Sequence, residues 1–166
     1  MSSKDNNQKC VLVVIADGFE ETDAIVILSL LRQAGICVKS VGLTSGLIGS
    51  AHGVWIMPDL TLAGLDRLTD TTSISTVILP EGRLSLARLE ADPRVHRLLR
   101  RVVAQRGHIV TSAEGLRVPR AAALWGEEPG AADDGQRMPV LLREPGQSPE
   151  ALALDLIRRL KQPSLA

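Results

Sequence analysis

The stretch VLVVIADGFEETD, residues 11–23, decides the fold of this chain. Its first part, residues 11–16, is a continuous apolar run, which is typical of a parallel strand buried on both faces of a sheet. Gly18 then interrupts the run, and the acidic residues that follow suit the first turn of a helix. The stretch therefore predicts a strand, a loop and a helix, in that order.

The segments that follow extend this alternation. Residues 20–34 carry apolar side chains at helical spacing, and Gly35 ends the predicted helix. Residues 36–41 predict a second strand, which completes a βαβ unit with a right-handed crossover. Further strands are predicted at 54–57, 76–79, 108–113 and 138–142, and further helices from Pro93 to about Gln105 and from Pro149 to Lys161.

Alternating strands and helices predict an α/β fold in three layers, with a mostly parallel sheet between helices on both faces. A length of 166 residues and the lack of a linker predict one domain over 1–166, with a flexible N-terminus at 1–9. Residues 126–135, rich in Gly, Pro and acid, predict a mobile loop. One fold must therefore carry the function.

Composition excludes several classes of function. The 19 lysines and arginines balance the 19 aspartates and glutamates, so no net field attracts nucleic acid or an anionic membrane. No apolar run approaches the ~20 residues of a membrane span. Cys10 and Cys37 lie in apolar runs without metal-ligand spacing and are interpreted as reduced core thiols. We expect a cytoplasmic protein with no cofactor.

Ligands of such folds bind outside the carboxyl ends of the strands. Three predicted loops meet there: residues 16–23, 79–82 and 111–115. At these loops the sequence resembles the ThiJ/PfpI superfamily, in the branch of the parkinsonism-associated deglycase. The segments that carry the resemblance are residues 16–35, residues 54–59 and the Leu-Pro-x-Gly turn at 79–82, with a weaker return at 144–146 and in the last helix.

The resemblance implies a flavodoxin-like fold of the class I glutamine amidotransferase-like type, and a homodimer. It also implies a site in which a cysteine on a strained strand-to-helix elbow lies beside a glutamic acid from the first helix. A helix N-terminus and a hydrogen-bonding acid stabilise the thiolate of such a cysteine. In the superfamily, the elbow cysteine lies six residues after one glycine and two residues before another. In this chain the matching glycines are Gly107 and Gly115, and both counts lead to Ala113.

By the same resemblance, the acid of the first helix falls at Asp23, one methylene shorter, and its neighbouring acid falls at Glu20. We interpret Glu20 as a structural carboxylate that favours the helix dipole and bonds loop amides. Backbone amides of Gly82 and Glu114 would supply oxyanion donors. The implied ligand-binding set is Glu20, Asp23, Glu81, Gly82, Ala113, Glu114 and Gly115.

Ser112 is an alternative nucleophile, because a serine at an elbow can react when a base lies nearby. It is one residue out of register with Ala113, and such a step along a strand reverses the face of the side chain. None of the histidines, His52, His96 and His108, offers a convincing base. We therefore interpret Ser112 as a small polar residue at a strand end.

Four acids, Glu20, Asp23, Glu81 and Glu114, map to one neighbourhood. Closely spaced carboxylates must protonate, separate or share a cation. We favour the simplest solution, in which Glu81 and Glu114 point into water, and predict no metal.

The leading hypothesis is a catalytically degenerate member of this superfamily with a binding, scaffolding or regulatory role. The first alternative is a glyoxalase-like, deglycase-like or hydrolytic enzyme that uses the carboxylates or Ser112. The second is a small-ligand or metal sensor that uses the vacated acidic pocket. The region of the superfamily's catalytic histidine is shortened here to residues 117–136, so we expect a remodelled pocket wall.

Overall fold

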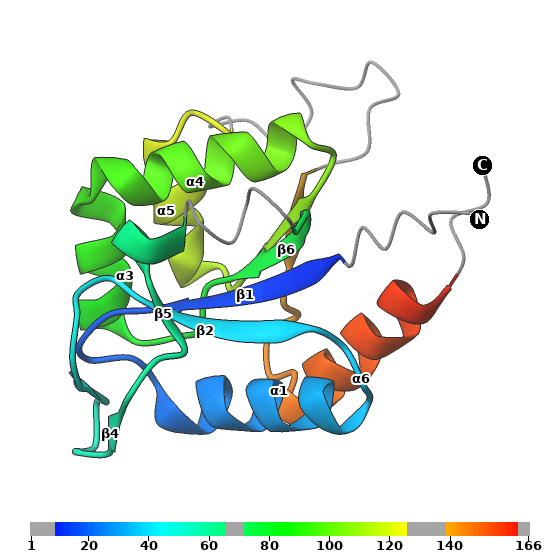
Figure 1. Cartoon of the computed structure of the whole chain (residues 1–166), viewed down its shortest axis with the longest axis horizontal. Coiled ribbons are helices and arrows are strands. Elements are labelled where there is room, and N and C mark those ends of the chain that lie inside the picture. Colours follow the sequence, from blue (N-terminus) through cyan, green and yellow to red (C-terminus); the bar gives the residue numbers. More distant parts are fainter. Residues whose placement is uncertain (1–8, 66–71, 126–138, 163–166) are drawn as a thin grey trace, which may run out of the picture.

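The central sheet confirms the predicted α/β fold. The computed structural model describes residues 9–65, 72–125 and 139–162, and within them six parallel strands run in the order β5-β2-β1-β6-β7-β8 (Figure 1). Without the short β5, this is the 2-1-3-4-5 order of flavodoxin, whose switch point lies between the first strand and the third, here β1 and β6. The strand bounds are β1 Cys10–Ile15, β2 Val38–Gly42, β5 Leu60–Thr61, β6 Ile74–Ile78, β7 His108–Thr111 and β8 Val140–Leu142.

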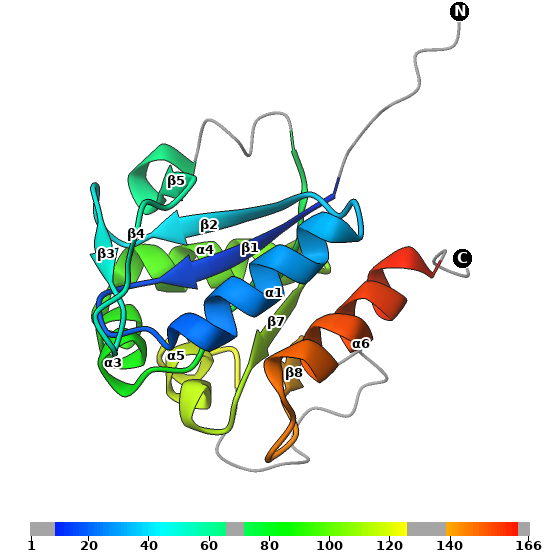
Figure 2. The ribbon, with the colours of Figure 1, turned by 90° about the horizontal axis from the view of Figure 1, so that it is seen from below.

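Helices cover both faces of this sheet (Figure 2). Helices α1 (Glu21–Gln33) and α6 (Pro149–Lys161) pack together on one face. The other face carries α3 (Arg83–Ala91), α4 (Pro93–Ala104) and α5 (Arg117–Ala121). Strand β1 is buried along its whole length, with alternate side chains in the two cores, as its unbroken apolar run predicts.

The predicted starts of two helices are confirmed by their caps. The Asp92 carboxylate accepts a hydrogen bond of 2.8 Å from the Arg94 amide ahead of α4, and Ser148 Oγ accepts one of 3.2 Å from the Ala151 amide ahead of α6. Proline follows each cap, at the position where a missing N–H costs nothing. These ends were predictable because a cap and its helix are local in sequence.

Two predicted strands differ from the structure. The predicted strand 54–57 lies outside the main sheet, because β4 (Trp55–Ile56) pairs antiparallel with β3 (Ile48–Gly49) as a small hairpin. The predicted strand 108–113 ends at Thr111, since the chain turns at once into the 3-10 turn η2 (Glu114–Leu116). Of the predicted strand 138–142, the structure describes only residues 139–142, of which β8 forms the last part.

The β3–β4 hairpin is attached to the loop that follows β1. The Gly49 amide donates to Asp17 Oδ1 at 2.9 Å, the Gly18 amide donates to the Gly49 carbonyl at 2.8 Å, and the Ala51 amide donates to the Phe19 carbonyl at 2.8 Å. The hairpin therefore extends the carboxyl edge of the sheet. Residues 1–8 and the predicted loop 126–135 lie outside the described residues. Within the described ranges, no helix combines the length and apolarity needed to cross a membrane.

Candidate functional site

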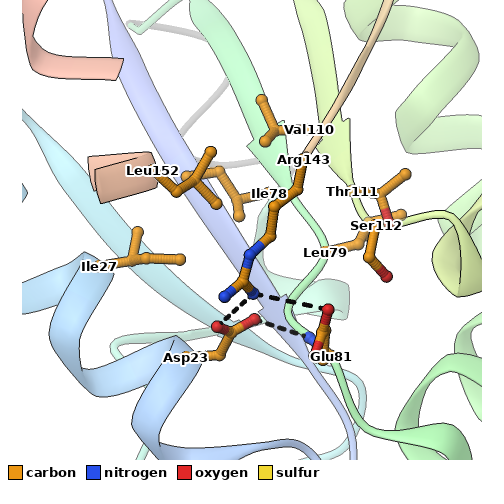
Figure 3. Close-up of a pocket in the computed structure, with 10 residues that line it drawn as sticks. All are labelled: Asp23, Ile27, Ile78, Leu79, Glu81, Val110, Thr111, Ser112, Arg143 and Leu152. Atoms are coloured by element: carbon orange, nitrogen blue, oxygen red, sulfur yellow. Dashed lines mark hydrogen bonds and ion pairs between the residues drawn. The ribbon is translucent and has the colours of Figure 1, made fainter. Parts of the chain in front are cut away.

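The carboxylate of Asp23 lies at the centre of the candidate site. Asp23 belongs to the first turn of α1, and its side chain is buried. Its Oδ1 accepts a hydrogen bond of 2.6 Å from Arg143 Nη1, and its Oδ2 accepts one of 3.1 Å from the Glu81 amide. Figure 3 shows both contacts. The acid is thus held by a cation and by the loop after β6.

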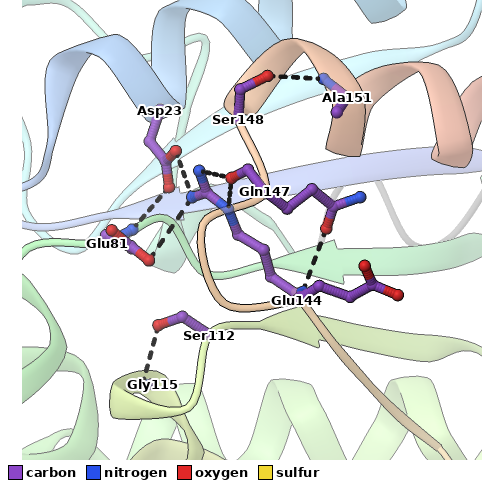
Figure 4. A network of polar contacts seen from close by, with 9 residues as sticks. Asp23, Glu81, Ser112, Gly115, Glu144, Gln147, Ser148 and Ala151 are labelled. Atoms are coloured by element: carbon purple, nitrogen blue, oxygen red, sulfur yellow. Dashed lines mark hydrogen bonds and ion pairs between the residues drawn. The ribbon is translucent and has the colours of Figure 1, made fainter.

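Arg143 follows β8. Its amide and all three guanidinium nitrogens donate hydrogen bonds to other groups of the protein. Its amide donates to the Thr111 carbonyl at 2.8 Å, which continues the pairing of β8 with β7. Its Nε and Nη2 donate to the Gln147 carbonyl at 2.7 and 2.5 Å, in the loop before α6 (Figure 4). Glu81 Oε1 lies 3.6 Å from Nη1. The guanidinium therefore joins α1, the loop after β6 and the loop before α6.

These contacts nearly close the cavity at the carboxyl edge. It measures about 10 Å³, which is close to the room that one water needs. Asp23, Glu81, Ser112 and Arg143 supply its polar lining, and the rest is mostly aliphatic. The pocket that the sequence led us to regard as vacated is filled by an arginine.

Ser112 and Ala113 lie differently with respect to this cavity. Ser112 lines it, and its Oγ accepts a hydrogen bond of 3.4 Å from the Gly115 amide (Figure 4). Ala113 is exposed and has ordinary right-handed helical angles, φ −57° and ψ −39°. The strained elbow that the resemblance implies is therefore absent at Ala113.

The four acids that the sequence assigned to one neighbourhood divide into separate environments. Asp23 and Glu81 share the charge of Arg143. The Glu20 amide donates to the Glu81 carbonyl at 2.8 Å, so its backbone belongs to the site, although its carboxylate makes no capping bond to α1. Glu114 is exposed on η2. The sequence therefore correctly brought Asp23 and Glu81 together, but it did not predict Arg143, the cation between them.

Glu20, Glu21 and His52 form a group that could hold a metal ion. His52 Nδ1 lies 3.0 Å from Glu21 Oε1 and 3.6 Å from Glu20 Oε1, and one ligand atom from each residue lies within 4.8 Å of the others. A hydrogen bond from its own amide, with the nearby His52, lowers the pKa of Glu21. The attached β3–β4 hairpin brings His52 to the start of α1. Two carboxylates and an imidazole are ligands that suit zinc or other first-row ions.

None of the three histidines lines the cavity beside Ser112. His52 faces the start of α1, and His96 Nε2 lies 2.7 Å from the Glu90 carbonyl oxygen. His108 begins β7, at the amino end of the sheet, opposite to the site. A serine nucleophile with a histidine base is not assembled here.

Comparison with known proteins now places the chain. A sequence model described as the DJ-1/PfpI family matches residues 9–122, which is more than half of the chain. The chain belongs to the DJ-1/PfpI family.

Curated relatives in the family include the Parkinson disease protein 7 homolog of Danio rerio, 29% identical over 108 residues, and the protein dj-1beta of Drosophila melanogaster, 36% identical over 75 residues. These matches cover 64% and 45% of this chain, and 56% and 38% of the two relatives. The chain thus aligns with roughly half of each relative's length or less.

Solved structures of the family share the fold over nearly the whole chain. The crystal structure of Drosophila melanogaster DJ-1beta superposes with a TM-score of 0.75, at 22% identity, and covers 92% of this chain and 90% of that one. A cysteine-to-alanine mutant of a DJ-1 superfamily protein from Salmonella typhimurium gives a TM-score of 0.71, at 28% identity and with the same coverage. Both structures therefore support the fold of this chain over nearly its whole length.

Gly82 lies where two loops of this DJ-1/PfpI protein cross closely at the site. Its φ is +127°, and a Cβ added there would lie 2.8 Å from Phe19 Cα and 3.0 Å from the Glu20 amide nitrogen. Only a residue without a side chain lets the loop after β6 cross the loop after β1 so closely. The predicted site residue Gly82 is thus required by geometry, whatever its role in binding.

Proposed function

We propose that this chain is a catalytically degenerate member of the DJ-1/PfpI family with a binding, scaffolding or regulatory role. The observation that carries the proposal is the Asp23–Arg143–Glu81 ion cluster, because the cavity that these three residues share with Ser112 measures only about 10 Å³. By the family resemblance the nucleophile position is Ala113, whose methyl group has no reactive atom. An acid bound to arginine is also poorly placed to activate a thiol.

The two cysteines of the chain do not replace the missing nucleophile. Cys10 begins β1 and Cys37 directly precedes β2, so both lie at the amino ends of parallel strands. The site lies at the carboxyl ends, on the opposite edge of the sheet. The reduced state that we assign to both thiols agrees with our proposal of a cytoplasmic location.

The test is an assay panel on methylglyoxal, glycated amines and simple esters, with the Asp23→Ala variant as control. We expect the wild-type protein to turn over none of them faster than this variant does. Turnover that the variant loses while its circular dichroism spectrum stays native would refute the proposal.

Ser112 supports the second candidate, a hydrolytic enzyme, because its hydroxyl lines the same cavity as Asp23 and Glu81. Ester hydrolysis that disappears in Ser112→Ala and persists in Ser148→Ala would establish that candidate. The third candidate is a ligand or metal sensor, and Glu20, Glu21 and His52 are the ligands on which it would depend. A sensor would show ligand-dependent thermal stabilisation, because binding to the folded state alone raises apparent stability.

We further propose that the chain forms a homodimer through α1 and the β3–β4 hairpin. Most apolar side chains of residues 24–31 in α1 pack inside the chain's own core. The exposed apolar side chains of this region lie instead on the outer side of α1 and around β4, and they are Ile25, Val54, Trp55 and Met57. Trp55, 62% exposed, also borders an open groove of about 680 Å³ with Leu47 and Leu84. Large exposed apolar side chains of this kind favour contact with a second copy.

Light scattering at micromolar concentration tests the dimer. We expect about twice the 17.8 kDa of one chain, and a lower mass for Trp55→Ser. The matched control is Leu154→Ser, which removes an exposed apolar side chain from α6 and leaves the mass unchanged. A monomer throughout that concentration range would contradict the proposal.

A further inference from the structure

The two cysteines, far apart in sequence, lie side by side at the amino end of the sheet. Cys10 is the first residue of β1, and Cys37 directly precedes β2. Val11 is in register with Val38, and the Val11 amide donates to the Cys37 carbonyl at 2.8 Å. One step back along both strands places Cys10 opposite Cys37. Side chains opposite each other in a parallel pair point to the same face of the sheet.

The proximity of Cys37 also affects the thiol of Cys10. Burial, followed by a hydrogen bond with Cys37, raises the pKa of Cys10 to about 12. Neighbouring strands are about 4.8 Å apart, which falls within the Cα separation of roughly 4.4–6.8 Å that disulfides span. The pair therefore needs little backbone movement to become covalently linked.

The two sulfurs differ in access. Cys10 is fully buried, whereas Cys37 is partly exposed in the turn between α1 and β2. An oxidant from solvent therefore meets Cys37 first. The buried Cys10 is then the thiol adjacent to the oxidised Cys37 sulfur. An accessible thiol beside a second cysteine is the arrangement of a redox pair.

We propose that Cys10 and Cys37 form a reversible disulfide when the protein meets hydrogen peroxide. The Cys37 sulfur attacks one peroxide oxygen, the O–O bond breaks, and Cys37 becomes a sulfenic acid with release of one water. The Cys10 sulfur then attacks the Cys37 sulfur, the S–O bond breaks, and hydroxide leaves with the Cys10 proton as a second water. The two sulfurs lose two electrons in total, and the peroxide gains them.

The proposed link joins β1 to β2 across the loop that contains α1. It lies at the opposite end of the sheet from Asp23 and Arg143, so it does not depend on the function proposed for that site. Because a cross-link restricts the unfolded chain, the oxidised protein should melt at a higher temperature than the reduced one. Thiol reductants should reverse the shift.

The test is intact mass spectrometry of the whole chain after hydrogen peroxide treatment, followed by denaturation with N-ethylmaleimide. We expect wild-type protein to lose two hydrogen atoms and take up no maleimide, and to take up two maleimides after reduction. Digestion should yield one cross-linked peptide pair that contains both cysteines.

Variants and the remaining outcomes make the test decisive. Cys10→Ser should accumulate oxygen adducts on Cys37, whereas Cys37→Ser should keep Cys10 reduced and open to maleimide only after denaturation. Oxygen adducts without a cross-link in the wild type would overturn the proposal, and so would an unchanged mass or a disulfide between two chains. Peptide mapping of the wild type decides the matter even if a variant fails to fold.

Discussion

Asp23 and Arg143 form an ion pair of 2.6 Å between side chains that are only 7% and 10% exposed. The pair links the first turn of α1 to the loop before α6, which lies 120 residues away in the chain. It also occupies the place where a ligand of this fold would bind, at the carboxyl ends of the strands. Breaking the pair should therefore affect both the stability of the protein and the access to this cavity.

Replacing Asp23 with Ala should lower the free energy of unfolding by about 3 kcal/mol, because the buried guanidinium then keeps only the partly exposed carboxylate of Glu81, 3.6 Å away. Arg143→Met should also destabilise the protein, because it leaves the buried carboxylate alone. The double variant should cost clearly less than the sum of the two, since neither charge then remains. Urea unfolding at neutral pH measures all three, and strictly additive costs would show that the pair is not coupled.

Placing a cysteine at Ala113 should not recreate a reactive thiol, even with Asp23→Glu. The backbone of Ala113 is unstrained and exposed, and the acid of α1 is bound by Arg143. We therefore expect the thiol of Ala113→Cys to titrate near the ~8.5 of a free cysteine. Adding Glu114→Ala should lower that pKa slightly by removing a neighbouring negative charge. Thiolate absorbance against pH measures it, and a pKa below about 7 would mean that the elbow forms in solution.

Gly82→Ala should destabilise the protein more than Gly35→Ala does. Both glycines have positive φ, but an added Cβ at Gly82 meets the backbone of Phe19, whereas nothing lies within 4 Å of one at Gly35. We expect about 1–2 kcal/mol at Gly35 from the backbone angles alone. At Gly82, overpacking adds about 1–3 kcal/mol. Equal shifts of the urea midpoint would contradict the close crossing of the two loops.

Acid should remove the stabilising effect of Asp59. Partial burial raises the pKa of Asp59, but hydrogen bonds from the Ser40 amide and hydroxyl, at 2.7 and 2.8 Å, and the charge of Arg32 lower it overall. A carboxyl whose pKa is lower in the folded state stabilises the protein above its unfolded pKa of about 3.9. That stability is lost as the pH falls through the folded pKa.

The measurement for Asp59 compares the urea midpoint of the wild type with that of Asp59→Asn from pH 7 down to pH 3. The difference between the two should stay constant from pH 7 to about pH 5 and shrink below about pH 4. Glu144→Gln, which changes an exposed carboxyl in the loop before α6, provides a control. If the difference between the two midpoints grew as the pH fell, folding would raise the pKa of Asp59 instead of lowering it.

The sequence alone determined the βαβ opening and the ends of the capped helices. The run at 11–16 is apolar on both faces, which only a covered parallel strand requires, and Asp92 and Ser148 act within three residues of themselves. Helix α3 was missed because its buried face includes Ser85, whose Oγ accepts a hydrogen bond from the Ala16 amide. A buried serine breaks the apolar periodicity on which such a prediction rests.

Some residues of the site could likewise be predicted from the sequence, whereas others depend on contacts between distant segments. Parallel strands end at one edge, so the sequence could bring Asp23, Glu81 and Ser112 together through the loops that carry them. The direction of Ser112 and Ala113 depended on where β7 ends, which neighbouring strands decide. Arg143 was overlooked because a lone arginine before Glu-Pro-Gly shows no partner in sequence. Only the packing of α6 against α1 brings its guanidinium to Asp23, because an ion pair depends on distance in space and leaves no local pattern in the chain.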